Sequence, residues 1–480
     1  MNGPINQHFA MTIDGREVLS DTTLTVVNPA TGAAIADAPR ASRAQLDEAV
    51  AAARRAFPAW RDRPLAERQA FVMQLGQVLV ENLETLKRLL TAEQGKPHGD
   101  AQMEIMGSAL WCKGYASLPI KTVVNEDSDA RLSTTRHVPL GVVAAISPWN
   151  YPLNLSIWKI AAALCAGNTV VLKPSPFTPL TCLKMGQLAA AILPPGVLNV
   201  ISGGDELGPW LTAHPGVNKI SFTGSTATGK KVLEAAARDL KRVTLELGGN
   251  DAAIVLPDVD VADVAPKLFW SAFRNTGQLC VATKRLYVHA AIYDSFKTAL
   301  VDYARTVKVG DGAEQGSQLG PIQNRPQYER VVSLIEDCKA EGMTFLLGGE
   351  VDRSQPGFFV PVTILDNPPE HSRVVAEEAF GPVLPLLKFH DTDDVIARAN
   401  DTVYGLAGSV WSKDVQAAER IAERLETGTV WINESHHLWF DVPFAGHKQS
   451  GFGVENGIEG LLEFTVPQTI TLRRPPAARA

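Results

Sequence analysis

Cys280 is the residue whose surroundings most strongly suggest chemistry. It lies in the stretch Asn275-Thr276-Gly277-Gln278-Leu279-Cys280-Val281-Ala282, with no second cysteine nearby to pair with it or to share a metal. Earlier in the chain a single carboxylate, Glu246, stands between two leucines and just before Gly248 and Gly249. A solitary thiol and a solitary carboxylate beside sharply turning backbone indicate a nucleophile and its base. Taken alone, a cysteine is more often a buried inert thiol, and the glutamate could be a satisfied structural group.

Two further polar residues follow predicted strands. Asn150 lies between Pro148 and Pro152, which fix the backbone on both sides, so its amide can be held at one point as an oxyanion donor. The alternative is a turn asparagine that bonds its own backbone. Lys173 ends another strand, where the crevice of a parallel sheet binds ligands, although most lysines are simply solvated.

A third strand end carries small residues that suit a phosphate. The phrase Phe222-Thr223-Gly224-Ser225 ends a strand and opens a helix, with Gly229 one turn inside it. Such a helix N-terminus presents free backbone N–H groups to an anion. The phrase is not the GxGxxG fingerprint, and a tight strand-to-helix turn explains it equally well.

Composition excludes several classes of protein. The 480 residues are 45% hydrophobic and 20% charged, with 45 basic and 52 acidic side chains. A net charge of −7 without a basic cluster argues against nucleic acid as a partner. The five cysteines are scattered, so we expect neither disulfides nor a metal site. The chain shows no secretion signal and no apolar run of about 18 residues, so we expect a cytoplasmic protein that does not bind membranes.

The order of apolar runs predicts two α/β domains with parallel sheets. Residues 43–94 have the spacing of two or three amphipathic helices. Between residues 142 and 247 apolar strands alternate with helices, and a second series runs from residue 252 to 404. Residues 131–138 and 465–472 alternate polar and apolar side chains, which predicts strands of a small separate sheet.

Taken together, these phrases resemble the aldehyde dehydrogenase superfamily over almost the whole chain, in the family's order. The matching phrases are Asn28-Pro29-Ala30-Thr31-Gly32, Glu93-Gln94-Gly95-Lys96-Pro97, Pro148-Trp149-Asn150-Tyr151-Pro152, Lys173-Pro174-Ser175, Phe222-Thr223-Gly224-Ser225, Leu245-Glu246-Leu247-Gly248-Gly249, Gly277-Gln278-Leu279-Cys280, Glu377-Glu378-Ala379-Phe380-Gly381-Pro382-Val383, Pro443-Phe444-Ala445-Gly446-His447-Lys448-Gln449-Ser450-Gly451 and Glu455.

The resemblance implies a three-part fold. A variant Rossmann domain for the dinucleotide would comprise residues 1–120 and 140–248, and a catalytic α/β domain residues 249–449. Residues 121–139 and 466–475 would form oligomerisation strands, as expected of a homodimer or homotetramer.

The resemblance also implies a mechanism. Cys280 would attack an aldehyde as the thiolate, and Asn150 with the Cys280 backbone N–H would hold the oxyanion. After hydride transfer to the cofactor, Glu246 would activate the water that opens the thioester. Lys159 and Glu455 match residues associated with proton relay.

For the cofactor, the resemblance implies NAD. Lys173 would bind ribose hydroxyls, Ser225 the pyrophosphate and Glu378 the nicotinamide ribose, with Phe380 beside the ring. The remaining cofactor-binding residues would be Ser147, Trp149, Ser175, Gly224, Gly229 and Leu247. Many NAD-using members carry a glutamate where this chain has Pro176, and its loss makes NADP possible as well.

The expected substrate is an apolar aldehyde, aromatic or medium-chain aliphatic, because the residues expected around the tunnel are mostly apolar. They are Tyr151, Trp158, Leu279, Val281, Leu438 and Phe444. No pair of arginines is evident to hold a second carboxylate. His436 and His437 are expected to be surface-loop histidines.

Three alternatives remain. A coenzyme A-acylating relative would typically lack the glutamate at position 246, because water must not compete with the thiol of the coenzyme. A structural or binding protein on the same fold would have no reason to keep Asn150, Glu246 and Cys280 together. A cysteine hydrolase would need a histidine in a comparable phrase, and the sequence offers none.

Overall fold

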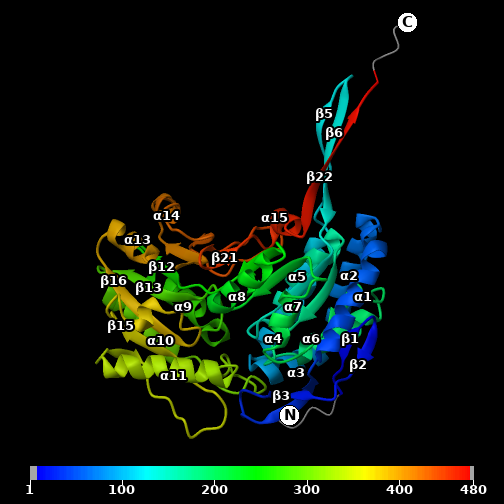
Figure 1. Ribbon diagram of the computed structural model, residues 1–480. Helices are drawn as coiled ribbons and strands as arrows, with labels where there is room; N and C mark the ends of the chain where they lie inside the picture. Colours follow the sequence, from blue (N-terminus) through cyan, green and yellow to red (C-terminus); the bar gives the residue numbers. More distant parts are fainter. Residues whose placement is uncertain (1–7, 476–480) are drawn as a thin grey trace.

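The computed structural model describes residues 8–475, whose strands build two large sheets in separate halves of the molecule (Figure 1). The first is an eight-stranded sheet in which the strands from β9 to β11 run parallel, while β1, β2 and β21 are antiparallel additions. In spatial order its strands are β2 (Arg16–Val18), β1 (Met11–Ile13), β9 (Leu198–Val200), β8 (Thr169–Lys173), β7 (Val142–Ile146), β10 (Lys219–Thr223), β11 (Arg242–Glu246) and β21 (Gly451–Phe452).

Helices bury this sheet, which is why its central strands are nearly continuous apolar runs. Every residue of β7 is buried, for example. The helices packed on the sheet are α1 (Arg43–Arg61), α5 (Pro152–Ala166), α6 (Leu180–Ala190), α7 (Leu207–Thr212) and α8 (Thr226–Ala237). Helix α5 is the most deeply buried of them; Pro152 starts it and Gly167, at φ 97°, ends it.

The second sheet has seven strands, which are parallel except for the edge strand β14. In spatial order they are β14 (Phe345–Leu347), β15 (Thr363–Asp366), β16 (Val383–Phe389), β13 (Thr283–His289), β12 (Asp251–Val255), β18 (Ala407–Trp411) and β19 (Thr429–Ile432). Its helices are α9 (Val261–Phe273), α10 (Tyr293–Arg305), α11 (Arg325–Ala340), α12 (Arg373–Ala376), α13 (Thr392–Asn400) and α14 (Val415–Ala422). The short 3₁₀ helix η1 (Arg274–Gly277) leads from α9 to Cys280.

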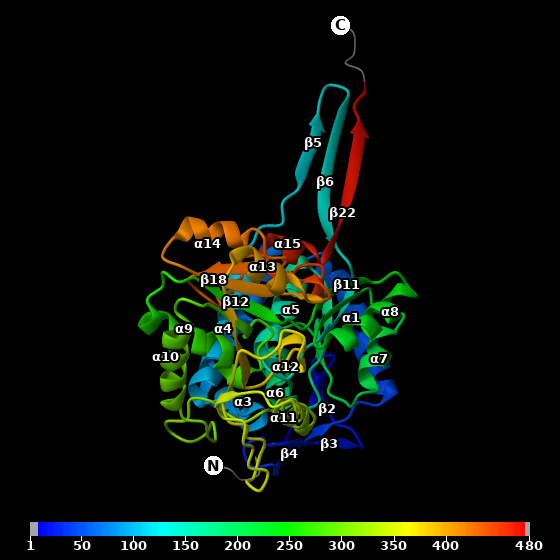
Figure 2. The same cartoon turned by 90° about the vertical axis from the view of Figure 1, so that its left-hand side faces the viewer.

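A third sheet projects from the body of the molecule (Figure 2). It joins β5 (Val123–Asp127), β6 (Arg131–Pro139) and β22 (Thr465–Arg473), all antiparallel. The register puts Val124, Ile470, Leu132 and Leu472 on one face and the hydrogen-bonded pairs Ser133–Thr471 and Thr135–Thr469 on the other. Within this chain the apolar face is open to solvent, since Val124, Ile470 and Leu472 are each more than half exposed.

Most predicted elements are present, and the differences have a physical reason. Residues 43–94 form three helices, α1, α2 (Leu65–Glu81) and α3 (Leu83–Gln94). Helix α4 (His98–Tyr115) was not predicted, because it contains three glycines and buries polar Glu104 and Ser108, so the apolar spacing of a surface helix is missing. The other unpredicted elements are β1 to β4, including β3 (Thr23–Val27) and β4 (Ala34–Pro39). Those after residue 404 are β17 (Tyr404–Gly405), β18, α14, β19, β20 (His447–Lys448), β21 and α15 (Gly457–Leu462).

Among the described residues, no helix is both long enough and apolar enough to cross a membrane.

Candidate active site

Cys280, Glu246 and Asn150 converge where the two large sheets meet the α9–β13 connection. Glu246 is the last residue of β11, Asn150 follows β7, and Cys280 follows η1. Burial raises the pKa of the half-buried Cys280 thiol to about 12, and the carboxylates of Asp251, Glu246 and Glu378 add to the rise. Glu246 therefore lies close enough to act on the thiol electrostatically.

The turn before Cys280 has an unusual backbone. Asn275, Thr276 and Gly277 have φ values of 51°, 59° and 72°, so three successive residues are left-handed. A Cβ on Gly277 would lie 2.2 Å from the carbonyl oxygen of Gly381, which is why only glycine fits there. The Asn275 amide donates to the Gln278 carbonyl at 3.3 Å and stabilises this costly conformation.

Asn150 is fixed through both its side chain and its backbone. Its Nδ2 donates to the Gln278 carbonyl at 3.0 Å, and its own carbonyl accepts from Asn275 Nδ2 at 3.1 Å. An amide nitrogen carries two hydrogens, so one remains for a further acceptor. The nucleophile turn and the amide thus hold each other in one geometry, as an oxyanion site requires.

A buried ion pair between Lys96 and Glu104 helps to hold the Asn150 loop in place. Lys96 Nζ donates to Glu104 Oε2 at 2.6 Å and to the Asn150 carbonyl at 2.9 Å, and lies 3.7 Å from the centre of the Tyr151 ring. Glu104 Oε1 accepts from the backbone N–H groups of Leu153 and Asn154 at 3.0 and 3.2 Å, which are free donors at the start of α5. The pair therefore joins the Asn150 loop to α5. Neither residue was assigned a role from the sequence.

Glu246 is buried, and neither of its carboxylate oxygens has a hydrogen-bond partner. Burial raises its pKa well above the usual range, the charge of Glu455 raises it further, and the charge of Lys159 opposes the rise. Lys159 on α5 forms a buried ion pair with Glu455, and Ser221 Oγ donates to Glu455 at 3.2 Å. The structure thus brings together the two residues matched to proton relay, next to the expected base.

The six residues expected to line the tunnel belong, with Cys280, to one apolar cluster. The Trp158 ring lies 6.2 Å from that of Phe444 and stacks at 5.2 Å on that of Trp111, which was not predicted. The expectation for His436 was wrong: its Nε2 is buried without a partner, and burial, then the charge of Arg274, lowers its pKa to about 3. This imidazole is therefore neutral. His437 is exposed, as expected.

The residues expected to bind the cofactor lie mainly at the carboxyl ends of the parallel strands, where such sheets bind nucleotides. Lys173 Nζ donates to the Pro174 carbonyl at 3.2 Å, and burial lowers the pKa of this amine to about 8. The exposed Ser225 is the N-cap of α8 and accepts from Thr228 N at 3.3 Å. The Trp149 and Phe380 rings meet edge to face at 5.3 Å.

The remaining expected cofactor residues have structural roles of their own. Ser156 Oγ donates to Ser147 Oγ at 2.8 Å, and Ser175 Oγ accepts from Phe177 N at 3.3 Å. A Cβ on Gly229 would lie 2.4 Å from the Leu247 side chain. A Cβ on Gly224 would lie 2.5 Å from the ring of Phe222. A side chain at either position would therefore displace the neighbouring Leu247 or Phe222 side chain.

Lys284, in β13, is a charged neighbour of the thiol that the sequence did not reveal. Its Nζ donates to the carbonyls of Leu279 and Cys280 at 3.1 and 2.6 Å, and lies 3.5 Å from Glu378 Oε1. Glu378 in turn accepts from Gly249 N at 3.1 Å. A lysine inside a buried strand has no motif around it, so only the structure could place it here.

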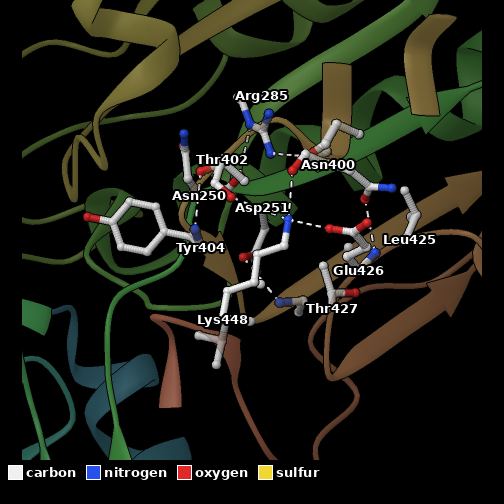
Figure 3. A pocket seen from close by; sticks show the side chains of 16 residues that line it. Asn250, Asp251, Arg285, Asn400, Thr402, Tyr404, Leu425, Glu426, Thr427 and Lys448 are labelled. Atoms are coloured by element: carbon white, nitrogen blue, oxygen red, sulfur yellow. Dashed lines mark hydrogen bonds and ion pairs between the residues drawn. The ribbon is translucent and has the colours of Figure 1, made fainter. Parts of the chain in front are cut away.

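A pocket beside β12 is not part of this site (Figure 3). Lys448 Nζ there bonds the Asn400 carbonyl at 2.7 Å and pairs with Glu426 at 2.7 Å, while Arg285 Nε donates to the Asn250 carbonyl at 2.9 Å. The space that remains is about 10 Å³, hardly enough for one water. These groups tie the segment around β20 to the second sheet.

Comparison with known proteins decides the family, since the sequence profile of the aldehyde dehydrogenase family matches residues 17–470. The chain belongs to the aldehyde dehydrogenase family. A Pseudomonas sp protein described as a probable aldehyde dehydrogenase is 43% identical to this chain. The alignment covers 97% of this chain and 95% of the Pseudomonas protein. The phenylacetaldehyde dehydrogenase of Pseudomonas fluorescens is 40% identical over 94% and 93% of the two chains. The structure of an aldehyde dehydrogenase from Bacillus cereus in complex with NAD+ superposes with a TM-score of 0.94 and is 37% identical in sequence. The alignment covers 98% of this chain and 97% of the Bacillus cereus chain.

The Lys96–Glu104 pair predicts a coupling that kinetics can measure. Lys96→Met should lower kcat/KM for aldehyde oxidation about tenfold or more, because it frees the carbonyl of Asn150 and misplaces the amide. Loss of a single oxyanion donor costs roughly 10²–10³ in rate, so Asn150→Ala sets the upper limit. When Asn150 is already replaced by alanine, Lys96→Met should lower kcat/KM by only about threefold or less.

Thermal unfolding of each variant is the control, because removing one partner of a buried pair also destabilises a protein by about 3–5 kcal/mol. Lys96→Arg, which keeps the charge, should be affected least. Full additivity of the Lys96→Met and Asn150→Ala effects would mean that the pair does not act through Asn150.

Proposed function

We propose that the protein oxidises an aldehyde to the free carboxylic acid with NAD, through a thioester on Cys280. The observation that carries the proposal is Glu246, a buried carboxylate with no hydrogen-bond partner that lies next to a thiol and a fixed amide. Burying such a group without a partner is unfavourable, and a water-activating base gives a reason for it.

The residues suggest the order of events. The Cys280 thiolate adds to the carbonyl carbon, and the remaining Asn150 Nδ2 hydrogen and the Cys280 N–H receive the negative charge on oxygen. When bound, the nicotinamide cofactor supplies the acceptor for the hydride that leaves the substrate carbon. Water then adds to the thioester, its proton passes to Glu246, and the sulfur leaves. We expect the carboxylate of Glu455, which is paired with Lys159, to take that proton onward.

Several features favour NAD as the cofactor. The expected ribose lysine, Lys173, is buried at a strand end, and the N-terminus of α8 beside Ser225 is open to an anion. The structurally similar Bacillus cereus enzyme was solved with NAD+. Pro176 leaves no carboxylate to repel the 2′-phosphate of NADP, so NADP is expected as a weaker second cofactor.

Two substitutions test the reaction. Cys280→Ala should abolish NADH formation while cofactor binding persists. Glu246→Gln should give a burst of NADH and then turn over about 10²–10⁴ times more slowly, because the thioester forms but loses its base. In the wild type, the hydrolytic rate should rise as pH rises through the elevated pKa of Glu246, since only the carboxylate accepts a proton; Glu246→Gln should lack this limb.

The control is coenzyme A. The wild-type enzyme should release the free acid whether or not coenzyme A is present, as followed by mass spectrometry. Formation of acyl-CoA as the main product would overturn the hydrolytic assignment and establish the acylating alternative.

For the substrate we propose an apolar aldehyde, aromatic or medium-chain aliphatic. Trp158, Phe444 and Val281 are buried in the cluster that contains Cys280, and the nearby His436 is neutral. Beyond the expected residues, the structure adds two cations near His436, namely Arg274 and Lys284. A charged substrate would lose its hydration in such surroundings, which is unfavourable unless it is paired.

A panel of aldehydes tests this class. Benzaldehyde and hexanal should show kcat/KM values at least about tenfold above those of succinate semialdehyde and betaine aldehyde, which corresponds to about 1.4 kcal/mol. Each assay repeated with NADP should give the lower kcat/KM. A preference for succinate semialdehyde would show that the proposed apolar substrate class is wrong. A strong preference for NADP would show that the proposed cofactor, NAD, is wrong.

We also propose that the chain divides at the boundaries expected above, that it works in the cytoplasm, and that β5, β6 and β22 join subunits of a homodimer or homotetramer. The solvent-open apolar face of that sheet supports the last point, because exposed contiguous apolar surface marks an interface. No second chain is needed for the contacts around Cys280 described above.

Light scattering after gel filtration tests the assembly. Ile470→Glu should lower the molar mass, because it places a charge on the apolar face. Thr471→Glu, on the opposite polar face of the same strand, is the matched control and should leave the mass unchanged. An unchanged mass for both variants would remove this sheet from the interface.

A further inference from the structure

The charges around Cys280 oppose its function as a nucleophile. Carboxyl groups face the thiol from three elements, namely Glu246 at the end of β11, Asp251 in β12 and Glu378 in the loop before β16. Each disfavours a thiolate, and burial acts in the same direction. A thiol in such surroundings needs a nearby positive charge if it is to react as an anion.

Lys284 is the group that meets this need. Of the charges that act most strongly on Cys280, that of Lys284 is the one that opposes the rise in the pKa of the thiol. Its Nζ donates to the carbonyls on both sides of the Cys280 N–H, at Leu279 and Cys280, and makes a longer contact of 3.4 Å with Ala282. Its side chain is only 5% exposed, so little water screens the charge.

We propose that Lys284 is the positioning residue that both holds the turn bearing Cys280 and supplies the positive charge that makes its thiolate accessible. The proposal rests on the proposed function only in taking Cys280 as the nucleophile. Glu378, 3.5 Å from Lys284 Nζ, competes with the thiolate for this charge. The residue expected to hold the nicotinamide ribose is therefore electrostatically linked to the thiol.

The neighbouring Arg285 shows why the position matters. It is also a buried cation in β13, but it points to the other side of the strand, where it bonds the carbonyls of Asn250, Arg398 and Ala399 at 2.8 to 3.0 Å. These contacts give Arg285 a structural role, because they join β13 to neighbouring backbone segments. Lys284 differs because the carbonyls that it bonds belong to the turn of the nucleophile. Asp251 also interacts with the charge of Lys284, whereas the nearby imidazole of His436 is neutral and does not compete for that charge.

The test is the rate of alkylation of Cys280 by iodoacetamide between pH 7 and 9, with the full-length protein and no cofactor, followed at the Cys280 peptide by mass spectrometry. Iodoacetamide is uncharged, so its rate follows the thiolate fraction. Lys284→Met should react about tenfold more slowly or worse, since an opposite charge at this range shifts a pKa by roughly one unit or more. Lys284→Arg should stay within about threefold of wild type.

The Glu378→Gln variant should change the alkylation rate in the opposite direction. Removing a carboxylate that faces the thiol should raise the alkylation rate about threefold or more, and it does not remove the lysine. If Lys284→Met is not folded, as judged by near-UV circular dichroism, Lys284→Arg and Glu378→Gln still decide the matter.

The outcomes separate charge from scaffolding. A lysine that only supports the turn would, when removed, loosen the turn and expose the thiol, so alkylation would become faster or stay the same. Either result for Lys284→Met, or slower alkylation of Glu378→Gln, overturns the proposal. Because the assay contains no aldehyde and no cofactor, an enzyme that forms no NADH would refute the proposed function without affecting this result.

Discussion

The buried ion pair between Lys96 and Glu104 is the interaction on which the site depends. One ammonium group bonds a carboxylate, a backbone carbonyl and an aromatic face, and the carboxylate completes the start of α5. Four segments are joined in this way, those of α3, α4, the Asn150 loop and α5. Helix α5 also carries Lys159, so the Asn150 amide and the ion pair beside Glu246 are held by the same connected segments. A loosely held pair of donors would not be preorganised for a transition state.

The buried charged groups differ in whether they have a partner. Lys96, Lys159 and Lys284 each have a carboxylate within 4 Å, and Lys219, buried in β10, pairs with Glu463 at 3.7 Å. Glu246 is the exception, with neither oxygen bonded. These four lysines are thus neutralised by partners, whereas Glu246, the proposed base, is left without one. Its elevated pKa is a direct consequence of that difference.

The sequence was most informative where a residue's own neighbours in the chain determine its environment. Apolar runs such as residues 142–146 predict buried strands, and Glu246 and Asn150 stand in phrases that predict their position at strand ends. Helix α4 was not predicted because its buried face mixes apolar residues with Gly114 and the polar side chains of Glu104 and Ser108. Lys96 appeared within a recognised phrase, but its role depends on Glu104 in another helix. Lys284 and His436 were missed or misjudged because three-dimensional burial decides their charge, and local spacing does not report it.

The long pairing between β6 and β22 has a consequence for biosynthesis. Its nine-residue ladder joins residues 131–139 to residues 465–473, and the same terminal segment provides β21 and Glu455. The first large sheet, the projecting sheet and the ion pair of Lys159 all remain incomplete until the segment from residue 451 to residue 473 has been translated. A nascent chain that ends before Glu455 lacks the partner of Lys159, so this side of the site can assemble only after that segment has been made.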